Sequence, residues 1–428
     1  MSIKRYSFLF SLFFFLFFLS FANSFRHSAE SQLNSYISLK NSNLPFIIIT
    51  TDGLKAINSR EKYRRAEVLF CKDFAEAQMQ SGNTQGLRCR IRGHGNSTWN
   101  TIYTNKRSYL LKLDEEKELF GMNAARKWVL QANVTDKTSL RNVYSYHIGA
   151  EIFDHAGWTA KTQFVHLVLN NKYLGLYGLM EKLEISPARL NLDDGSFLAE
   201  VNSRLNREWN FTSTKGVKFS IREKKGETID YYRAAEKKLQ DFENVLFSDS
   251  FKDEKTGYRE FVDLESFVDW YLINEYTKNH DARFQDSCFL FYSSADKKLH
   301  MGPIWDFDIA CGNAQHHGSG ETEGLLIQSQ HWFKRLWEDE FFRQKVAERW
   351  ADCRDNVENS IEWILQSATE LEYDANIDNT IWQRFGRMQW PNTKGYRQRK
   401  TYRAEVDYMT SWLKERIIWL DSAFASTE

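Results

Sequence analysis

The spacing of apolar residues changes along this chain, and that change most constrains its fold. Up to residue 181, short β-branched and aromatic runs are separated by turn residues, which predicts strands. From residue 228 onward, apolar residues recur at threes and fours, which predicts helices. The expected strands are 44–51, 66–71, 87–92, 107–114 and a hairpin of 164–169 with 173–180, with one helix at 139–155, and the expected later helices are 228–247, 262–278, 331–370 and 400–424.

This order of elements predicts an α+β protein with two lobes and a cleft between them. We expect a strand-rich N-terminal lobe at 44–181 and a mainly helical C-terminal lobe at 182–428. Residues 203–226 are polar and basic, which indicates a loop or an inserted hairpin. Residues 25–43 are rich in Ser and Asn, which is typical of a linker.

The N-terminus has the pattern of an export signal. Lys4 and Arg5 precede an apolar run rich in Phe and Leu, and small residues follow at Ala22 and Ser24. This pattern predicts a secretory signal peptide at 1–24. An uncleaved anchor is the alternative, although the run is short for a spanning helix, which needs about 20 residues. No later stretch is apolar enough to span, so we expect a periplasmic, cell-surface or extracellular protein with no membrane span after leader removal.

Charge balance and cysteine content place further limits on the class of protein. Lys+Arg and Asp+Glu both number 57, and this balance excludes a general nucleic-acid binder, which needs a basic excess. Export permits disulfides, and the five cysteines could form the pairs Cys71–Cys89 and Cys288–Cys311. Buried free thiols are the alternative. The oligomeric state is not predicted.

Two carboxylates one residue apart form the first candidate site. Asp306 and Asp308 follow the apolar run Pro303-Ile304-Trp305 and precede Gly312-Asn313. Alternate residues of a strand point the same way, so at a strand end both carboxylates can converge on one hard cation such as Mg²⁺ or Mn²⁺. A polar turn with Asp308 as a helix cap is the alternative. The setting favours the metal site.

Three other features point to phosphate chemistry. Asp281 lies in a loop between a predicted helix and a strand predicted at 288–292, and a loop acid in a cleft can orient or deprotonate a hydroxyl. Gly93-His94-Gly95 lies between a basic strand and a Ser/Thr run, where backbone N–H groups can face a phosphate. Lys112 lies on the next strand, which is where a kinase holds nucleotide phosphates. Each feature has an ordinary structural alternative. Asp281 could be an acid in a helix-terminal turn, Gly93-His94-Gly95 a tight loop, and Lys112 a surface lysine.

The ordered set of motifs resembles the CotH kinase family over nearly the whole mature chain. The landmarks are Arg92-Gly93-His94-Gly95-Asn96-Ser97-Thr98-Trp99, the Lys106–Asp114 strand, Lys127-Trp128-Val129-Leu130-Gln131-Ala132-Asn133, Leu140-Arg141-Asn142, Tyr173-Leu174-Gly175-Leu176-Tyr177-Gly178-Leu179-Met180-Glu181, Asn279-His280-Asp281 and Gly302-Pro303-Ile304-Trp305-Asp306-Phe307-Asp308. The resemblance implies an atypical protein-kinase-like bilobal fold. It also implies transfer of phosphate from ATP to Ser or Thr of a secreted or surface protein.

The resemblance assigns roles within a catalytic segment at 279–313. The implied roles are Asp281 as the catalytic acid, Asp306 as the Mg²⁺ ligand with Asp308 beside it, Lys112 as the phosphate-binding lysine, Arg92 and Arg141 facing phosphates or carboxylates, and Glu181 leading into the hinge. One position departs from the kinase pattern, which places an Asn five residues after the catalytic Asp. Asp286 occupies that position, and we expect it to be a further metal-binding carboxylate.

Two other functions remain open at this point. A catalytically silent CotH-like domain would serve as an envelope binding or assembly module. Another metal-dependent transferase would use Asp306 and Asp308 to hold a different nucleotide, such as a nucleotide-sugar. Metal-dependent ATP binding separates the kinase from the silent module, and nucleotide preference separates it from the other transferase.

Overall fold

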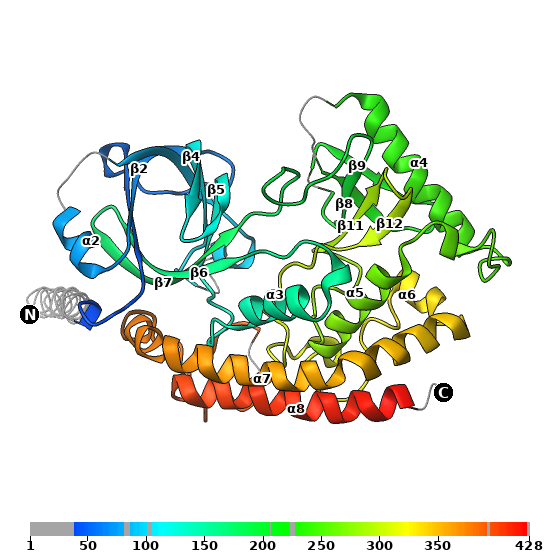
Figure 1. The fold of residues 1–428 in the computed structure, drawn as a ribbon. Helices are drawn as coiled ribbons and strands as arrows, with labels where there is room; N and C mark the ends of the chain where they lie inside the picture. Colours follow the sequence, from blue (N-terminus) through cyan, green and yellow to red (C-terminus); the bar gives the residue numbers. More distant parts are fainter. Residues whose placement is uncertain are drawn as a thin grey trace, which may run out of the picture.

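The computed structural model describes residues 38–80, 86–100, 104–205, 207–222, 227–391 and 394–425. The expected signal peptide at 1–24 and most of the expected linker at 25–43 lie outside these residues. The described residues form both strands and helices, which confirms the α+β class. Two β structures lie side by side, and two long helices run past both of them (Figure 1).

The first β structure is a closed barrel of seven strands in the order β1-β2-β3-β4-β5-β7-β6. All neighbours are antiparallel except β1 and β6, whose parallel pairing closes the ring. The strands are β1 (Phe46–Thr51), β2 (Arg64–Cys71), β3 (Leu87–Gly93), β4 (Tyr109–Leu119), β5 (Met122–Gln131), β6 (Thr162–Leu169) and β7 (Lys172–Glu181). Neither the closure of the barrel nor strand β5 was expected from the sequence.

Apolar side chains at alternate positions fill the barrel. Ile47 and Ile49 from β1, Val68 from β2, Ile91 from β3 and Leu111 from β4 are all fully buried. Burying such a side chain contributes roughly 1.5–3 kcal/mol each. The alternation that predicted strands is therefore the alternation that packs the barrel interior.

The second β structure is a five-stranded sheet in the order β12-β11-β8-β10-β9. Its strands are β8 (Phe197–Val201), β9 (Trp209–Thr212), β10 (Lys218–Ile221), β11 (Cys288–Ser293) and β12 (Lys298–Met301). The antiparallel pair β9–β10 is the inserted hairpin considered for 203–226. Strand β11 confirms the strand expected at 288–292, whereas β8 and β12 were unexpected in a half of the chain predicted to be mainly helical.

The helices lie mostly after residue 228, as expected. They are α2 (Phe74–Gln80), α3 (Arg141–Glu151), α4 (Ile229–Leu246), α5 (Leu264–Tyr276), α6 (His331–Leu336), α7 (Glu340–Trp382) and α8 (Tyr402–Ala425). Short 3₁₀ turns occur at Asp52–Leu54, Ser97–Trp99, Asp154–Ala156, Tyr258–Glu260 and His316–Gly318. The helix expected at 331–370 is two helices, because Asp339 caps a new start through the backbone N–H of Phe341.

Helix α7 is 43 residues long and packs along α8 beneath both β structures (Figure 1). A buried ion pair ties it to the barrel: Lys106 Nζ lies 2.8 Å from Asp378 Oδ1 and also donates to the carbonyl of Leu176. Arg384 binds the other carboxylate oxygen of Asp378 at 2.9 Å. This network fixes the end of α7 against the barrel wall.

All five cysteines are buried and free, so neither Cys71–Cys89 nor Cys288–Cys311 is a disulfide. The free-thiol alternative is the one observed. Among the described residues, no helix is both long enough and apolar enough to cross a membrane.

Candidate active site

Helix α3 positions the segment that carries the two neighbouring carboxylates. Asn142 Oδ1 accepts the backbone N–H of Phe307 at 2.7 Å, and Tyr146 Oη accepts that of Asp306 at 3.3 Å. The guanidinium of Arg141 donates to the carbonyls of Ala310 and Cys311. Phe307 is fully buried beside Tyr146, so the residues on either side of it are directed away from the core.

Asp306 and Asp308 belong to a loop, which corrects the expectation of a strand end. Strand β12 stops at Met301, and Asp306 adopts a left-handed backbone with φ of 65°. Such a conformation costs an L-residue of order 1 kcal/mol or more, and the bonds from α3 offset that cost. Asp308 Oδ2 accepts a 2.6 Å hydrogen bond from Thr135 Oγ1. The two acids are thus brought together by loop geometry and not by strand alternation.

Asp281 and Asp286 approach from the turn after α5. Asn279 shapes this turn, because its side chain accepts the backbone N–H of Asp281 at 3.2 Å. Asp286 is held by Ser203, whose hydroxyl donates to it at 3.0 Å, and it lies 3.5 Å from the Arg204 guanidinium. The position that departs from the kinase pattern is therefore a carboxylate with both a hydroxyl and a cation beside it.

All four carboxylates line one cavity of about 190 Å³. Its opposite wall is the loop after β3, which contains His94, Gly95 and Asn96. Arg60 anchors this loop by donating to the Gly95 carbonyl at 3.1 Å and to Asn96 Oδ1 at 2.6 Å. Gly93 is required because a side chain there would overlap the ring of Trp99. The predicted Gly-x-Gly turn therefore faces the predicted acids.

Burial and mutual repulsion raise the pKa values of the cavity acids. Burial and then Asp308 and Asp286 raise the pKa of Asp281 from 3.8 to about 7, while Arg204 opposes the shift. Burial, Asp308 and Asp281 raise the pKa of Asp306 well above its ordinary value. Burial raises the pKa of Asp308, and the bond from Thr135 opposes it. Crowded carboxylates of this kind are expected where a cation belongs.

A cationic cleft adjoins the acidic cavity. A space of about 670 Å³ shares Asp286 and Asp306 with the cavity and continues to Lys182, Arg207 and Arg222. A further space of about 540 Å³ shares those three cations. Lys112 lines this last space, which also contains the apolar side chains Leu183, Ile185, Leu198, Trp209 and Ile221. The acids thus lie at one end of a cleft whose middle is basic.

Lys182 is the most perturbed cation of the cleft. Burial, followed by repulsion from Arg222 and Arg207, lowers the pKa of Lys182 from 10.5 to about 7. Burial, with smaller effects from Lys182, Arg92 and other cations, lowers the pKa of His94 to about 3, so this imidazole is neutral at pH 7. Glu200 lies 3.4 Å from Arg207 and 2.7 Å from Arg222 and offsets part of this repulsion, and an anionic ligand beside Lys182 would offset more of it.

The other predicted residues lie at varying distances from this cleft. Arg92 lines its middle part, lies 5.2 Å from the centroid of the Tyr63 ring and donates to the Gly93 carbonyl. Arg141 is buried and pairs with Asp136 at 2.6 Å, so it faces a carboxylate. It supports from behind the loop that carries Asp306 and Asp308, which we call the acid loop. Glu181 is buried against Arg189 at 2.7 Å and accepts the backbone N–H of Lys161. Neither Arg141 nor Glu181 is among the residues lining the cavity or the cleft.

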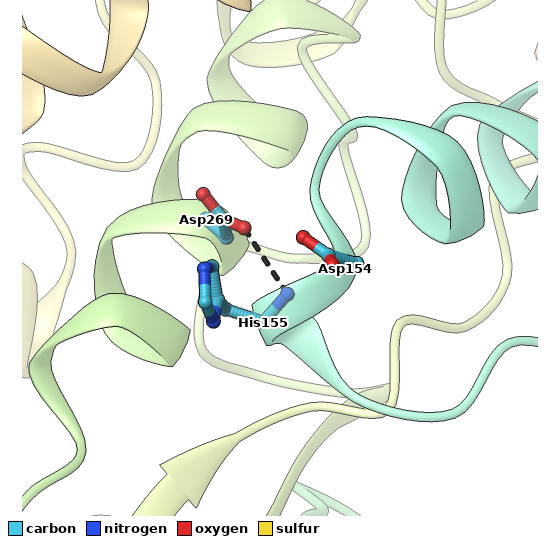
Figure 2. A group of neighbouring side chains, drawn as sticks. All are labelled: Asp154, His155 and Asp269. Atoms are coloured by element: carbon cyan, nitrogen blue, oxygen red, sulfur yellow. Dashed lines mark hydrogen bonds between the residues drawn. The ribbon is translucent and has the colours of Figure 1, made fainter.

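Two groups of side chains among the described residues bring three potential metal-binding atoms within 4.8 Å of one another, and neither lies in the cavity. One is Asp154, His155 and Asp269, drawn in Figure 2, where the His155 backbone N–H donates to Asp269. Arg349 already neutralises Asp269 through bonds of 2.7 and 3.1 Å, so this group is a structural ion pair. The other group is Asp263, Asp296 and His300.

Several residues of the site were not predicted from the sequence. No sequence motif singles out Lys182, Arg207 or Arg222. Only the strand pairing of the second sheet brings Arg207 and Arg222 toward Lys182. Asn142 was recognised only as part of a motif, and Thr135 was not considered. Their polar character in a segment that is otherwise buried was the signal that could have found them.

Comparison with known proteins agrees with this geometry. A family model described as CotH kinase protein matches residues 90–420, which include the Gly-x-Gly turn, all four acids and α7 with most of α8. The protein class defined by this match is kinase-like. The chain belongs to the CotH kinase family. No curated protein matches the chain.

Proposed function

We propose that this chain is an exported protein kinase that transfers the γ-phosphate of ATP to Ser or Thr of a secreted or surface protein. One observation carries the proposal: Asp281, Asp286, Asp306 and Asp308 share a cavity that opens into a cleft lined by cations. Phosphoryl transfer needs a metal-binding acid, an acid beside the attacking hydroxyl and cations for the phosphates.

In this proposal, Asp306 holds Mg²⁺ or Mn²⁺ together with Asp308 and Asp286. The fit rests on the chemistry of the donors, because carboxylates are the ligands these ions prefer and these carboxylates repel one another when no cation is present. When bound, the metal would neutralise phosphate charge during transfer. Thr135 and Ser203 hold two of the acids in place.

Asp281 is the proposed acceptor of the hydroxyl proton. It lines the same cavity as the proposed metal-binding acids, and a carboxylate beside a hydroxyl can accept its proton. In this account, the Ser or Thr hydroxyl of the acceptor protein lies beside Asp281. The oxygen attacks the γ-phosphorus, and ADP leaves into the cationic part of the cleft.

The cationic cleft is the proposed nucleotide site. Lys182, Arg207 and Arg222 would hold the phosphates, with Lys112 farther along the cleft. In a kinase-like arrangement, the barrel would be the N-terminal lobe and the segment after Glu181 would be the hinge. Leu183 and Ile185 of that segment give the cleft an apolar end suited to a flat base.

Calorimetric titration of the mature chain tests the nucleotide site. We expect ATP to bind only when Mg²⁺ or Mn²⁺ is present, and Asp306→Asn to abolish this metal-dependent binding. A nucleotide-sugar should not compete. Failure of ATP to bind with either metal, or tighter binding of a nucleotide-sugar, would overturn the kinase proposal. A matched control is Asp154→Asn, which changes an exposed acid outside the cavity.

A second candidate function is a binding module without catalysis. Asp286 favours it, because an acid stands where the kinase loop carries Asn and is already engaged by Ser203 and Arg204. In that case, both metal-dependent ATP binding and phosphate transfer would be absent.

A further inference from the structure

The segment joining α7 to α8 is strongly basic and approaches the acidic cavity. From Arg384 to Arg403 it contains seven cations and no carboxylate: Arg384, Arg387, Lys394, Arg397, Arg399, Lys400 and Arg403. The chain as a whole has zero net charge, so this concentration is local. Arg384 and Arg399 are buried in ion pairs with Asp378 and Glu405, so they serve the fold.

Four exposed members, Arg387, Lys394, Arg397 and Lys400, form what we call the basic rim. The ends of their loop are joined by a 2.7 Å bond from the Gly386 N–H to the Arg399 carbonyl. Within the basic rim, only Lys394 has a carboxylate within ion-pair distance among the described residues, and its partner Glu321 is itself exposed. The basic rim is therefore left with uncompensated positive charge.

The same loop reaches the reactive cavity. Trp390 lines that cavity together with Asp281 and Asp308. The loop also packs on the segment that supports the acids, because Lys137 donates to the Arg387 carbonyl at 3.0 Å, two residues from the Thr135 that binds Asp308. A ligand on the basic rim would thus be continuous with the cavity.

The cleft for the nucleotide leaves from a different side of the cavity. The residues shared between cavity and cleft include Arg204, Asp286 and Asp306, and they do not include Asp281, Asp308 or Trp390. If the nucleotide enters through the cleft, the acceptor must reach Asp281 from the Trp390 side. Trp390 on that side belongs to the loop that carries the basic rim.

We propose that the basic rim is the docking surface for an acidic segment of the acceptor protein. This inference rests on the proposed function, since it names the substrate class of the same site. Cations at a rim favour acidic partners and speed their association. The cavity itself is acidic, so the acidic residues of the partner should flank the hydroxyl at a distance and not adjoin it. The acceptor would be a polypeptide with a Ser or Thr between neutral residues and an acidic stretch nearby.

Peptide binding to the mature chain without nucleotide tests this proposal. Three fluorescent peptides carry one Ser within neutral residues, followed by a run of Glu, Gln or Lys. Fluorescence anisotropy at low salt should show at least tenfold tighter binding of the Glu peptide than of the Gln peptide, weakening as salt rises. The triple variant R387Q/R397Q/K400Q should weaken Glu-peptide binding about tenfold, as expected when a few exposed charge contacts are removed.

The matched control is R233Q/K237Q/K345Q, which removes the same charge from two exposed positions and one half-buried position outside the basic rim and should leave binding unchanged. Equal binding of the Glu and Lys peptides, or equal loss in both variants, would overturn the proposal. A further result would also overturn the proposal: the parent protein binds phosphatidylserine vesicles, the triple variant does not, and peptide binding is the same in both. The basic rim would then be a lipid-binding surface. Since no phosphate is transferred in this assay, a failure of transfer would count against the proposed kinase and not against the basic rim.

Discussion

The side-chain oxygen of Asn142 accepts the backbone N–H of Phe307 at 2.7 Å, between the two carboxylates of the acid loop. This bond fixes the first turn of α3 to the loop that presents Asp306 and Asp308. The rest of the site is built outward from it, because Tyr146 and Arg141 of the same helix bind the loop on either side. The helix and the loop are therefore one unit, although about 160 residues separate them in sequence.

The first prediction concerns this bond. Asn142→Ala leaves a buried N–H without an acceptor, which costs about 1–3 kcal/mol. We expect urea unfolding to show that loss, and metal-dependent ATP binding to weaken because Asp306 is no longer held. Glu151→Ala, at an exposed position in the same helix, is the control. Unchanged stability of Asn142→Ala would show that α3 does not organise the loop.

The second prediction follows from the raised pKa of Asp281. Its folded value of about 7 lies above the ordinary 3.8, so the folded protein binds a proton that the unfolded chain has lost between these pH values. Stability of the metal-free protein should therefore fall as pH rises from about 4 to 7. Asp281→Asn removes this dependence, and thermal unfolding should find the variant more stable than the parent at pH 8, with the difference shrinking at pH 4. A variant less stable at pH 8 would contradict the electrostatic account.

The third prediction concerns Lys182, whose pKa is lowered to about 7. A protonated lysine is needed to hold phosphate, so ATP affinity should fall as pH rises from 6 to 9. Lys182→Arg keeps its charge and should remove that fall, whereas Lys182→Gln should bind weakly at every pH. Calorimetry at several pH values measures these differences. An identical pH profile in all three proteins would place the phosphates elsewhere.

The fourth prediction tests the link between barrel and helices. Lys106→Met leaves the buried Asp378 with Arg384 as its remaining cation and the backbone N–H of Leu176 as a donor, and breaking a buried pair costs about 3–5 kcal/mol. Asp378→Asn should cost a similar amount, and the double variant should cost less than the sum of the two. Urea unfolding of the four proteins gives the coupling free energy. Strict additivity would mean that the pair does not act as a unit.

Much of the barrel could be predicted because its strands alternate between core and surface, and the hairpin turn at Asn170-Asn171 is typical of such a connection. Strand β5 was missed because its first half carries Asn, Arg and Lys, and only pairing with β4 makes that half a strand. In the second sheet, the β9–β10 hairpin was considered and strand β11 was expected, whereas β8 and β12 were missed because they are only five and four residues long and β8 is held by pairing with distant strands. Long-range pairing, and not local pattern, decides both cases.

The acids of the site could be predicted because motif order brought Asp281, Asp306 and Asp308 into one hypothesis, and the structure places them in one cavity. Lys182 could not be predicted, because its place beside Arg207 and Arg222 depends on the inserted hairpin. Arg141 carries the expected charge but faces Asp136 and the acid loop from behind. Sequence pattern indicates which side chains could take part in catalysis or binding, whereas tertiary packing decides which of them lie close together.

The most direct test of the central claim is transfer of labelled γ-phosphate to a Ser peptide. The protein is incubated with γ-labelled ATP and Mg²⁺ or Mn²⁺, and the phosphorylated residue is identified by mass spectrometry. We predict phosphoserine with the parent protein, a loss of at least about 100-fold with Asp281→Asn, as expected for a general base, and no transfer with Asp306→Asn. Absence of transfer by the parent protein, or transfer that survives both substitutions, would contradict the account.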